Sequence, residues 1–178
     1  MSTWSSVGGL DPSLDNFGMS RGIIVCDLKS KVKTLTINQT LLITTKGDES
    51  TRYKNMDDLR RARELGVQMN HFFAMTDTIY VELPTGSQSA RAMASYGICV
   101  GLVAALGKRV VRVSAKDVKM IATNNPKASK KDMIKWANNK YPKLPWLTRK
   151  LHGELVLTNA NEHIADSIAA IHAGLNMK

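Results

Sequence analysis

Cysteine and long apolar runs are both scarce in this sequence. Only two cysteines, Cys26 and Cys99, occur among 178 residues, and both lie within apolar stretches. This argues against a disulfide framework or a zinc site and favours small core residues in a reducing compartment. The longest apolar run, 98–106, is too short to cross a bilayer, and the N-terminus lacks a secretory signal pattern. We therefore expect a soluble, intracellular protein with no membrane-bound part.

Acidic residues are nearly missing from one long segment, Lys108–Lys150. It carries 13 Lys or Arg and only 2 Asp, whereas the whole chain has a net charge of +10. The remaining residues are therefore close to neutral, and the excess charge is local. A solvated lysine-rich face is one interpretation, and a polyanionic partner, nucleic acid before membrane, is the other. The length and the hydrophobic content of 43% predict one globular domain over residues 1–178.

The segment 5–14 reads as a short apolar strand that ends on a carboxylate. Pro12 has no backbone donor, so it stops the strand directly after Asp11. Gly8 and Gly9 remove side chains where another backbone or a ligand could approach. Asp11 is then either a turn-initiating residue before proline or a metal ligand, and the fragment by itself leaves both interpretations open.

Periodicity predicts the other elements and their order. Apolar and β-branched patterns predict strands at 21–27, 31–46, 78–82 and 109–113, with 16–18 in a loop and a bend or bulge at 38–39. Helical spacing predicts helices at 57–75, 87–106, 115–123, 130–139 and 160–175. The result is an α/β fold with a five-stranded mixed sheet flanked by helices, containing an antiparallel meander and a parallel crossover. Trp136, Tyr141 and Trp146 are either local core or stacking platforms for bases.

Carboxylates end two of the predicted strands. If the strands ending at Asp11 and Glu82 are parallel neighbours, both side chains emerge at the same end of the sheet. The last helix could add His163 and Asp166, although its spacing also fits a solvated acidic face. Clustered carboxylates suit Mg²⁺ or Mn²⁺, and two such ions can promote hydrolysis of a phosphodiester. A basic protein with an acidic centre has the charge distribution expected of a nuclease.

These motifs together resemble the RuvC-type Holliday-junction resolvases of the ribonuclease H-like superfamily. The resemblance rests on Gly-Leu-Asp-Pro-Ser-Leu at 9–14, the strand ending in Glu82, the alanine-rich helix after it, and Glu-His-x-x-Asp-Ser-Ile-Ala at 162–169. Glu-Leu-Pro at 82–84 and the Glu-His-x-x-Asp motif are most similar to the phage-encoded branch. For such a member the expected location is the host cytoplasm.

The resemblance implies a homodimeric crossover junction endodeoxyribonuclease that cuts a four-way DNA junction symmetrically. The implied catalytic residues are Asp11, Glu82, His163 and Asp166. Two Mg²⁺ or Mn²⁺ ions per site would be held by Asp11, Glu82, Glu162 and Asp166. The resemblance leaves open whether Glu162 or its neighbour His163 is the fourth ligand. The implied DNA-binding residues are Lys116, Lys119, Lys127, Lys130, Lys131, Lys135 and Lys140. The implied dimer interface contains Ala90, Ala94, Gly97 and Gly101.

The sequence departs from the family pattern at one position, and two alternative functions are also compatible with the sequence. The family often carries a junction-opening aromatic residue shortly after the glutamate, and the sequence here is Leu-Pro-Thr-Gly at 83–86. One alternative is the same fold acting mainly on flaps, forks or RNA–DNA hybrids. The other is a non-catalytic, basic DNA-binding protein, against which the acidic residues at two strand ends argue.

Overall fold

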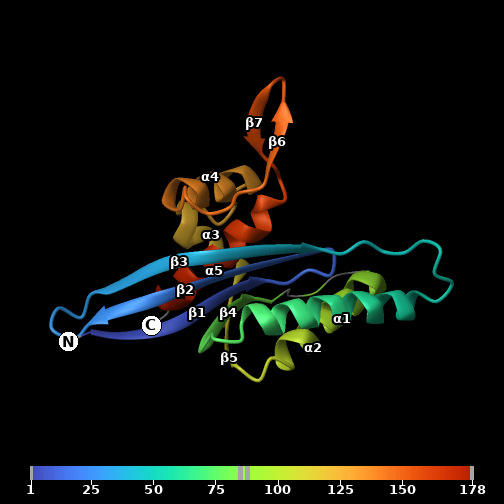
Figure 1. The fold of residues 1–178 in the computed structure, drawn as a ribbon, viewed down its shortest axis with the longest axis horizontal. Helices are drawn as coiled ribbons and strands as arrows, with labels where there is room; N and C mark the ends of the chain where they lie inside the picture. Colours follow the sequence, from blue (N-terminus) through green and yellow to red (C-terminus); the bar gives the residue numbers. More distant parts are fainter. Residues whose placement is uncertain (1, 84–85, 87–88, 177–178) are drawn as a thin grey trace.

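The protein folds around a five-stranded mixed sheet in the order β3-β2-β1-β4-β5 (Figure 1). The structure is a computed structural model, and it describes residues 2–83, 86 and 89–176. β1, β2 and β3 are antiparallel neighbours, and β4 and β5 run parallel to β1. The bounds are β1 Ser2–Asp11, β2 Asn16–Asp27, β3 Lys33–Thr44, β4 Thr78–Glu82 and β5 Arg109–Val113.

Helices cover both faces of this sheet. α1 and α2 lie on one face, and α3, α4 and α5 lie on the other (Figure 1). Each face has its own apolar core, one centred on α5 and one beneath α1 and α2. No helix in the described part of the chain is long and apolar enough to span a membrane. The bounds are α1 Lys54–Phe72, α2 Ala90–Ala104, α3 Ala115–Thr123, α4 Lys130–Lys140 and α5 Asn161–Asn176.

Glycines in the central strands let α5 lie directly on the sheet. A Cβ added at Gly9 would sit 1.8 Å from the carbonyl oxygen of Ser167, and one at Gly18 would sit 2.2 Å from that of His163. Real Cβ atoms do not approach other atoms so closely, so only glycine allows this contact. The small side chains of α5, including Ala165 and Ala169, are fully buried in the same layer. The backbone of α5 is thereby held against β1 and β2.

The predicted fold class is confirmed, and so is the parallel crossover from β4 through α2 to β5. The predicted loop at 16–18 is wrong, because all three residues pair with β3 and Gly18 also pairs with Asp11 of β1, so that they open the long strand β2. The predicted bulge is confirmed: Arg21 pairs with Gln39 and Gly22 with Ile37, which leaves Asn38 as the extra residue. The prediction that the second helix begins at 87 falls partly on residues outside the described part of the chain.

A second, two-stranded sheet was not predicted. β6 Thr148–Leu151 and β7 Glu154–Leu157 pair antiparallel in a hairpin between α4 and α5. The hairpin projects away from the main sheet at the end of the molecule where α4 lies (Figure 1). Its two turn residues, His152 and Gly153, both have positive φ, as a tight hairpin turn requires.

Candidate active site

Asp11 and Glu82 lie next to each other at the same end of the sheet. β1 and β4 are parallel neighbours, and their last paired residues are Leu10 and Val81. Asp11 and Glu82 are the residues that follow, and they end their strands. The parallel arrangement assumed from the sequence is therefore confirmed. In open α/β sheets this carboxyl edge is where functional side chains gather.

The first turns of α5 bring His163 to the same edge. The His163 carbonyl packs against Gly18 of β2, which is the partner of Asp11 in the sheet. The Nδ1 atom of His163 lies 2.7 Å from Oδ2 of Asp11, and both side chains are about one-fifth exposed. Because an ionised carboxylate can only accept, the histidine nitrogen donates this hydrogen bond.

Asp166, one turn further along α5, lies deepest in the cluster. Burial is the main cause that raises the pKa of Asp166 to about 8, and the charges of Asp11, Glu82 and Glu162 add to it. Its Oδ1 atom is buried and has no hydrogen-bond partner among the described residues. A buried carboxylate oxygen without a partner is costly, so this atom is a ready ligand for a cation.

The same surroundings shift the pKa of Glu82. Burial and the charge of Asp11 raise the pKa of Glu82 to about 7. Burial lowers the pKa of His163, but the hydrogen bond with Asp11 and the charges of Asp11 and Glu162 outweigh it, and the net pKa is raised. Together these shifts describe excess negative charge in a poorly solvated place, a condition that a bound cation would relieve.

Two lysines border the carboxylates. The Nζ atom of Lys130, the first residue of α4, lies 2.8 Å from Oε2 of Glu162. Lys119 of α3 acts at longer range and partly offsets the raised pKa values of Glu82 and Asp166. The sequence assigned both lysines to DNA binding only, and their effect on the carboxylates depends on how α3 and α4 pack beside α5.

The donor set fits a hard divalent cation in its chemistry. Aspartate and glutamate oxygens are what Mg²⁺ and Mn²⁺ prefer, and Asp166 offers an oxygen that has no partner. As placed, however, no three His, Cys, Asp or Glu side chains in the described ranges surround one point at ligand distances. Glu162 is turned to Lys130, and His163 is turned to Asp11. Binding of an ion would therefore require rearranged side chains around the preformed cluster.

The predicted basic and small-residue surfaces are accessible to solvent. Most of the predicted DNA-binding lysines are exposed on α3, α4 and the intervening loop, and Lys119 is half-buried. On α2, Ala90, Ala94, Gly97 and Gly101 are all exposed, and a Cβ at either glycine would meet nothing within 4 Å. The segment 83–86, where the family often carries a junction-opening aromatic residue, lies partly outside the described residues.

The three aromatic residues for which local core and base stacking were the alternatives pack locally. Trp136, Tyr141 and Trp146 are partly buried against the α5 core. The Nε1 atom of Trp146 donates to the carbonyl of Tyr141, and the Tyr141 hydroxyl lies 2.8 Å from Nε2 of His172. The structure thus favours the local-core interpretation.

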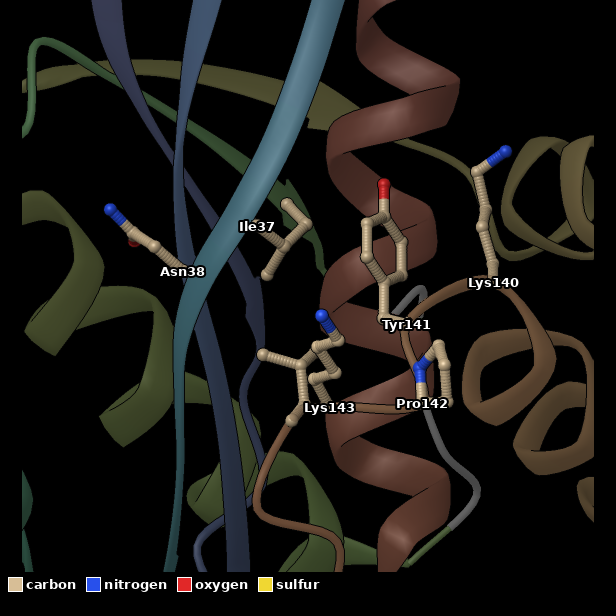
Figure 2. A pocket seen from close by; sticks show the side chains of 7 residues that line it. Ile37, Asn38, Lys140, Tyr141, Pro142 and Lys143 are labelled. Carbon is tan, nitrogen blue, oxygen red and sulfur yellow. The ribbon is translucent and has the colours of Figure 1, made fainter.

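A separate cavity of about 360 Å³ lies between β3 and the segment after α4. Tyr141, Pro142 and Lys143 line it opposite Ile37 (Figure 2). None of the clustered carboxylates contributes to it. The chemistry expected of the acidic cluster is therefore not located in this cavity.

Comparisons with known proteins agree with the architecture. No protein-family model and no curated protein matches the sequence. Among solved structures, Thermus thermophilus RuvC is similar with a TM-score of 0.61 and 16% identity, over 94% of this chain and 92% of that one. The structure of T. thermophilus RuvC in complex with Holliday junction substrate gives 0.60 and 17%, over 96% and 94%. At this identity the likeness concerns the fold, and the chain has the ribonuclease H-like α/β fold that RuvC also has.

Proposed function

We propose that this protein is a divalent-metal-dependent endonuclease that resolves branched DNA, four-way junctions above all. The observation that carries the proposal is the partly buried carboxylate cluster of Asp11, Glu82 and Asp166 at the edge of a RuvC-like sheet. A strongly basic segment beside an acidic cluster suits a phosphodiester substrate. The likeness to a resolvase solved with its junction supports DNA over other polyanions.

In this proposal Asp11, Glu82 and Asp166 would hold the metal, with His163 or Glu162 completing the set. Divalent cations supply an activated water and stabilise the leaving oxygen when they are bound. Asp166 is held by the buried α5 helix, which fixes its backbone relative to the two strand ends. His163 already shares a proton with Asp11, so its ring can move a proton at Nδ1 during hydrolysis. Lys130 holds Glu162 aside until a cation competes for it.

The proposed dimer would use the exposed small-residue face of α2. Ala90, Ala94, Gly97 and Gly101 leave room for the backbone of another helix to come close. Two copies related by symmetry would present two acidic clusters to one junction, and this would account for paired nicks. Mg²⁺ is the proposed ion, with Mn²⁺ as its substitute.

The test is cleavage of a synthetic mobile four-way junction by the pure protein, with linear and forked duplexes run in parallel. We expect symmetric nicks on the junction with Mg²⁺ or Mn²⁺ and none with EDTA. Asp11→Asn and Glu82→Gln should each lower cleavage at least a hundredfold while junction binding is retained. The matched control is Glu49→Gln, an exposed carboxylate in the loop before α1, which should cleave like the wild type.

Two results would refute the proposal. Tight junction binding with no cutting under any metal would favour a non-catalytic binding protein. Full cleavage by purified Asp11→Asn would remove the acidic cluster from the chemistry. Equal or better cutting of forks would keep the reaction but broaden the substrate beyond four-way junctions.

A further inference from the structure

The β6–β7 hairpin lies outside the main sheet and contributes none of the carboxylates of the acidic cluster. Its two strands pair only with each other, in a sheet separate from the main one, and project away from it (Figure 1). An isolated two-stranded hairpin is marginally stable in water. We therefore expect contact with a partner to stabilise this hairpin.

The hairpin exposes apolar side chains together with its charges. Leu155 is 70% exposed and Leu151 is 40% exposed, and Leu147 at its base is 39% exposed. All four residues of β6 lie on the surface. Leu155 shares one face of the ribbon with its partner Lys150, and Leu151 lies on the other face, so each face presents an exposed apolar side chain to water.

The base of the hairpin is fixed to the catalytic edge by a fully buried side chain. The Asn161 Oδ1 atom accepts from the Leu147 amide at 2.9 Å, and its Nδ2 atom donates to the Leu147 carbonyl at 2.8 Å and the Thr158 carbonyl at 3.1 Å. The Thr158 amide also donates to the Leu147 carbonyl at 3.0 Å. Asn161 directly precedes Glu162 and His163 on α5. The residue that anchors the base of the hairpin is therefore within two positions of Glu162 and His163, which belong to the acidic cluster.

Its charge favours nucleic acid as the partner. Arg149 and Lys150 lie in β6, Lys143 precedes it, and Glu154 is the one carboxylate within the hairpin. No ion pair joins Arg149 or Lys150 to a carboxylate within the ranges that the structure describes. Two free cations on an exposed ribbon are suited to phosphates, and their position at the end of the basic segment Lys108–Lys150 favours nucleic acid over a protein partner.

The shape fits a duplex groove. The major groove of B-DNA, about 12 Å wide, admits a two-stranded β-ribbon. From Leu147 to the turn at His152 the strand extends by roughly 16 Å, at about 3.3 Å per residue. The same length along DNA is about five base pairs at 3.4 Å each.

We propose that the β6–β7 hairpin is a second DNA-binding element, which enters a groove of the duplex arm beside the acidic cluster with Arg149 and Lys150 on its phosphates. The proposal rests on the proposed function for the presence of branched DNA at that edge.

The test compares the double variant Arg149→Gln, Lys150→Gln with the wild type. The matched control is Lys29→Gln, Lys33→Gln, which removes two exposed charges at the β2–β3 turn. Junction affinity is measured by fluorescence anisotropy from 50 to 300 mM salt, with Ca²⁺ in place of Mg²⁺ to prevent cutting. Each lost phosphate contact should weaken binding by roughly tenfold at 0.1 M salt and reduce the slope of log K against log salt by about 0.9.

Hydroxyl-radical footprinting gives a second measurement. We expect protection of about five base pairs on one arm in the wild type and its loss in the hairpin variant, with the control unchanged. Circular dichroism should show the same fold in all three proteins. A variant with the affinity, salt slope and footprint of the wild type would overturn the inference, and a protein partner would then become the better occupant.

The inference and the proposed function can fail separately. Normal cleavage with no effect of the hairpin variant would refute the hairpin inference alone. Failure of the wild type to cleave, combined with weaker junction binding by the hairpin variant, would refute the nuclease proposal and support the hairpin as a DNA-binding element.

Discussion

Replacing Asp166 with asparagine should stabilise the metal-free protein, and increasingly so as the pH rises. Burial and three neighbouring carboxylates raise the pKa of Asp166 from 3.8 to about 8. A carboxyl group with a raised folded pKa contributes stability that is fully present below its unfolded pKa. That contribution is lost as the pH rises from 3.8 to about 8. Asparagine keeps the shape of the side chain and removes the titration.

The size of this change in the free energy of unfolding follows from the interval between the unfolded pKa of 3.8 and the folded pKa of about 8. Each pH step above the unfolded pKa reduces the free energy of unfolding by about 1.4 kcal/mol while the folded carboxyl stays protonated. The wild type should therefore lose on the order of 4 kcal/mol between pH 4 and pH 7 through this group. Most of this loss falls above pH 5, so the advantage of Asp166→Asn should grow by roughly 2 to 3 kcal/mol from pH 5 to pH 7.

The assay is urea unfolding followed by circular dichroism in EDTA at several pH values. A constant difference between variant and wild type would reflect altered hydrogen bonding of the amide, so the change with pH is the diagnostic quantity. Glu49→Gln serves as the exposed control and should follow the wild type. Added Mg²⁺ should stabilise the wild type at pH 7 and have little effect on Asp166→Asn, because a ligand stabilises only the state that binds it. A pH-independent difference, or a more stable wild type at pH 7, would refute the buried-charge reasoning.

Two further predictions concern the helices on either face of the sheet. Gly9→Ala should lower the free energy of unfolding by about 3 kcal/mol in urea titrations, since its Cβ would meet the Ser167 carbonyl. An unchanged free energy of unfolding would contradict the close packing of α5. The double variant Gly97→Glu, Gly101→Glu places two charges on the proposed interface of α2 and should convert a dimer to a monomer in light scattering. The control Val67→Glu, at an exposed position of α1, should leave the dimer intact. An unchanged mass of the double variant would exclude α2 as the interface.

Local signals in the sequence were strong enough to define several elements. The bounds of β4, β5 and α3 match their predictions residue for residue, because each is a short periodic run between clear breaks. The ends of β1 and β4 were predicted because a carboxylate, Asp11 or Glu82, directly follows an apolar run. The sequence predicted that these two residues share an edge only if their strands are parallel neighbours, and the structure shows that β1 and β4 are. For the bounds of these elements the chain order and residue types were sufficient.

The hairpin and the long β2 strand were missed for different reasons. β6 and β7 are four residues each and almost fully exposed, so they carry no strong hydrophobic alternation. The available signal was His-Gly at 152–153, where two residues of positive φ turn the chain. Asn16 and Gly18 have little strand propensity of their own, and the pairing of residues 16–18 with the end of β3 places them in β2.

By itself the sequence determined the order of the elements, the fold class and the acidic residues at two strand ends. Only the tertiary structure decided the surroundings of Asp166. Helical periodicity placed it on a polar face of α5 that could equally have been solvated. Close packing of α5 on Gly9 and Gly18 turns that face towards the strand ends, away from water. Burial depends on which surfaces meet, and no single segment of the chain contains that information.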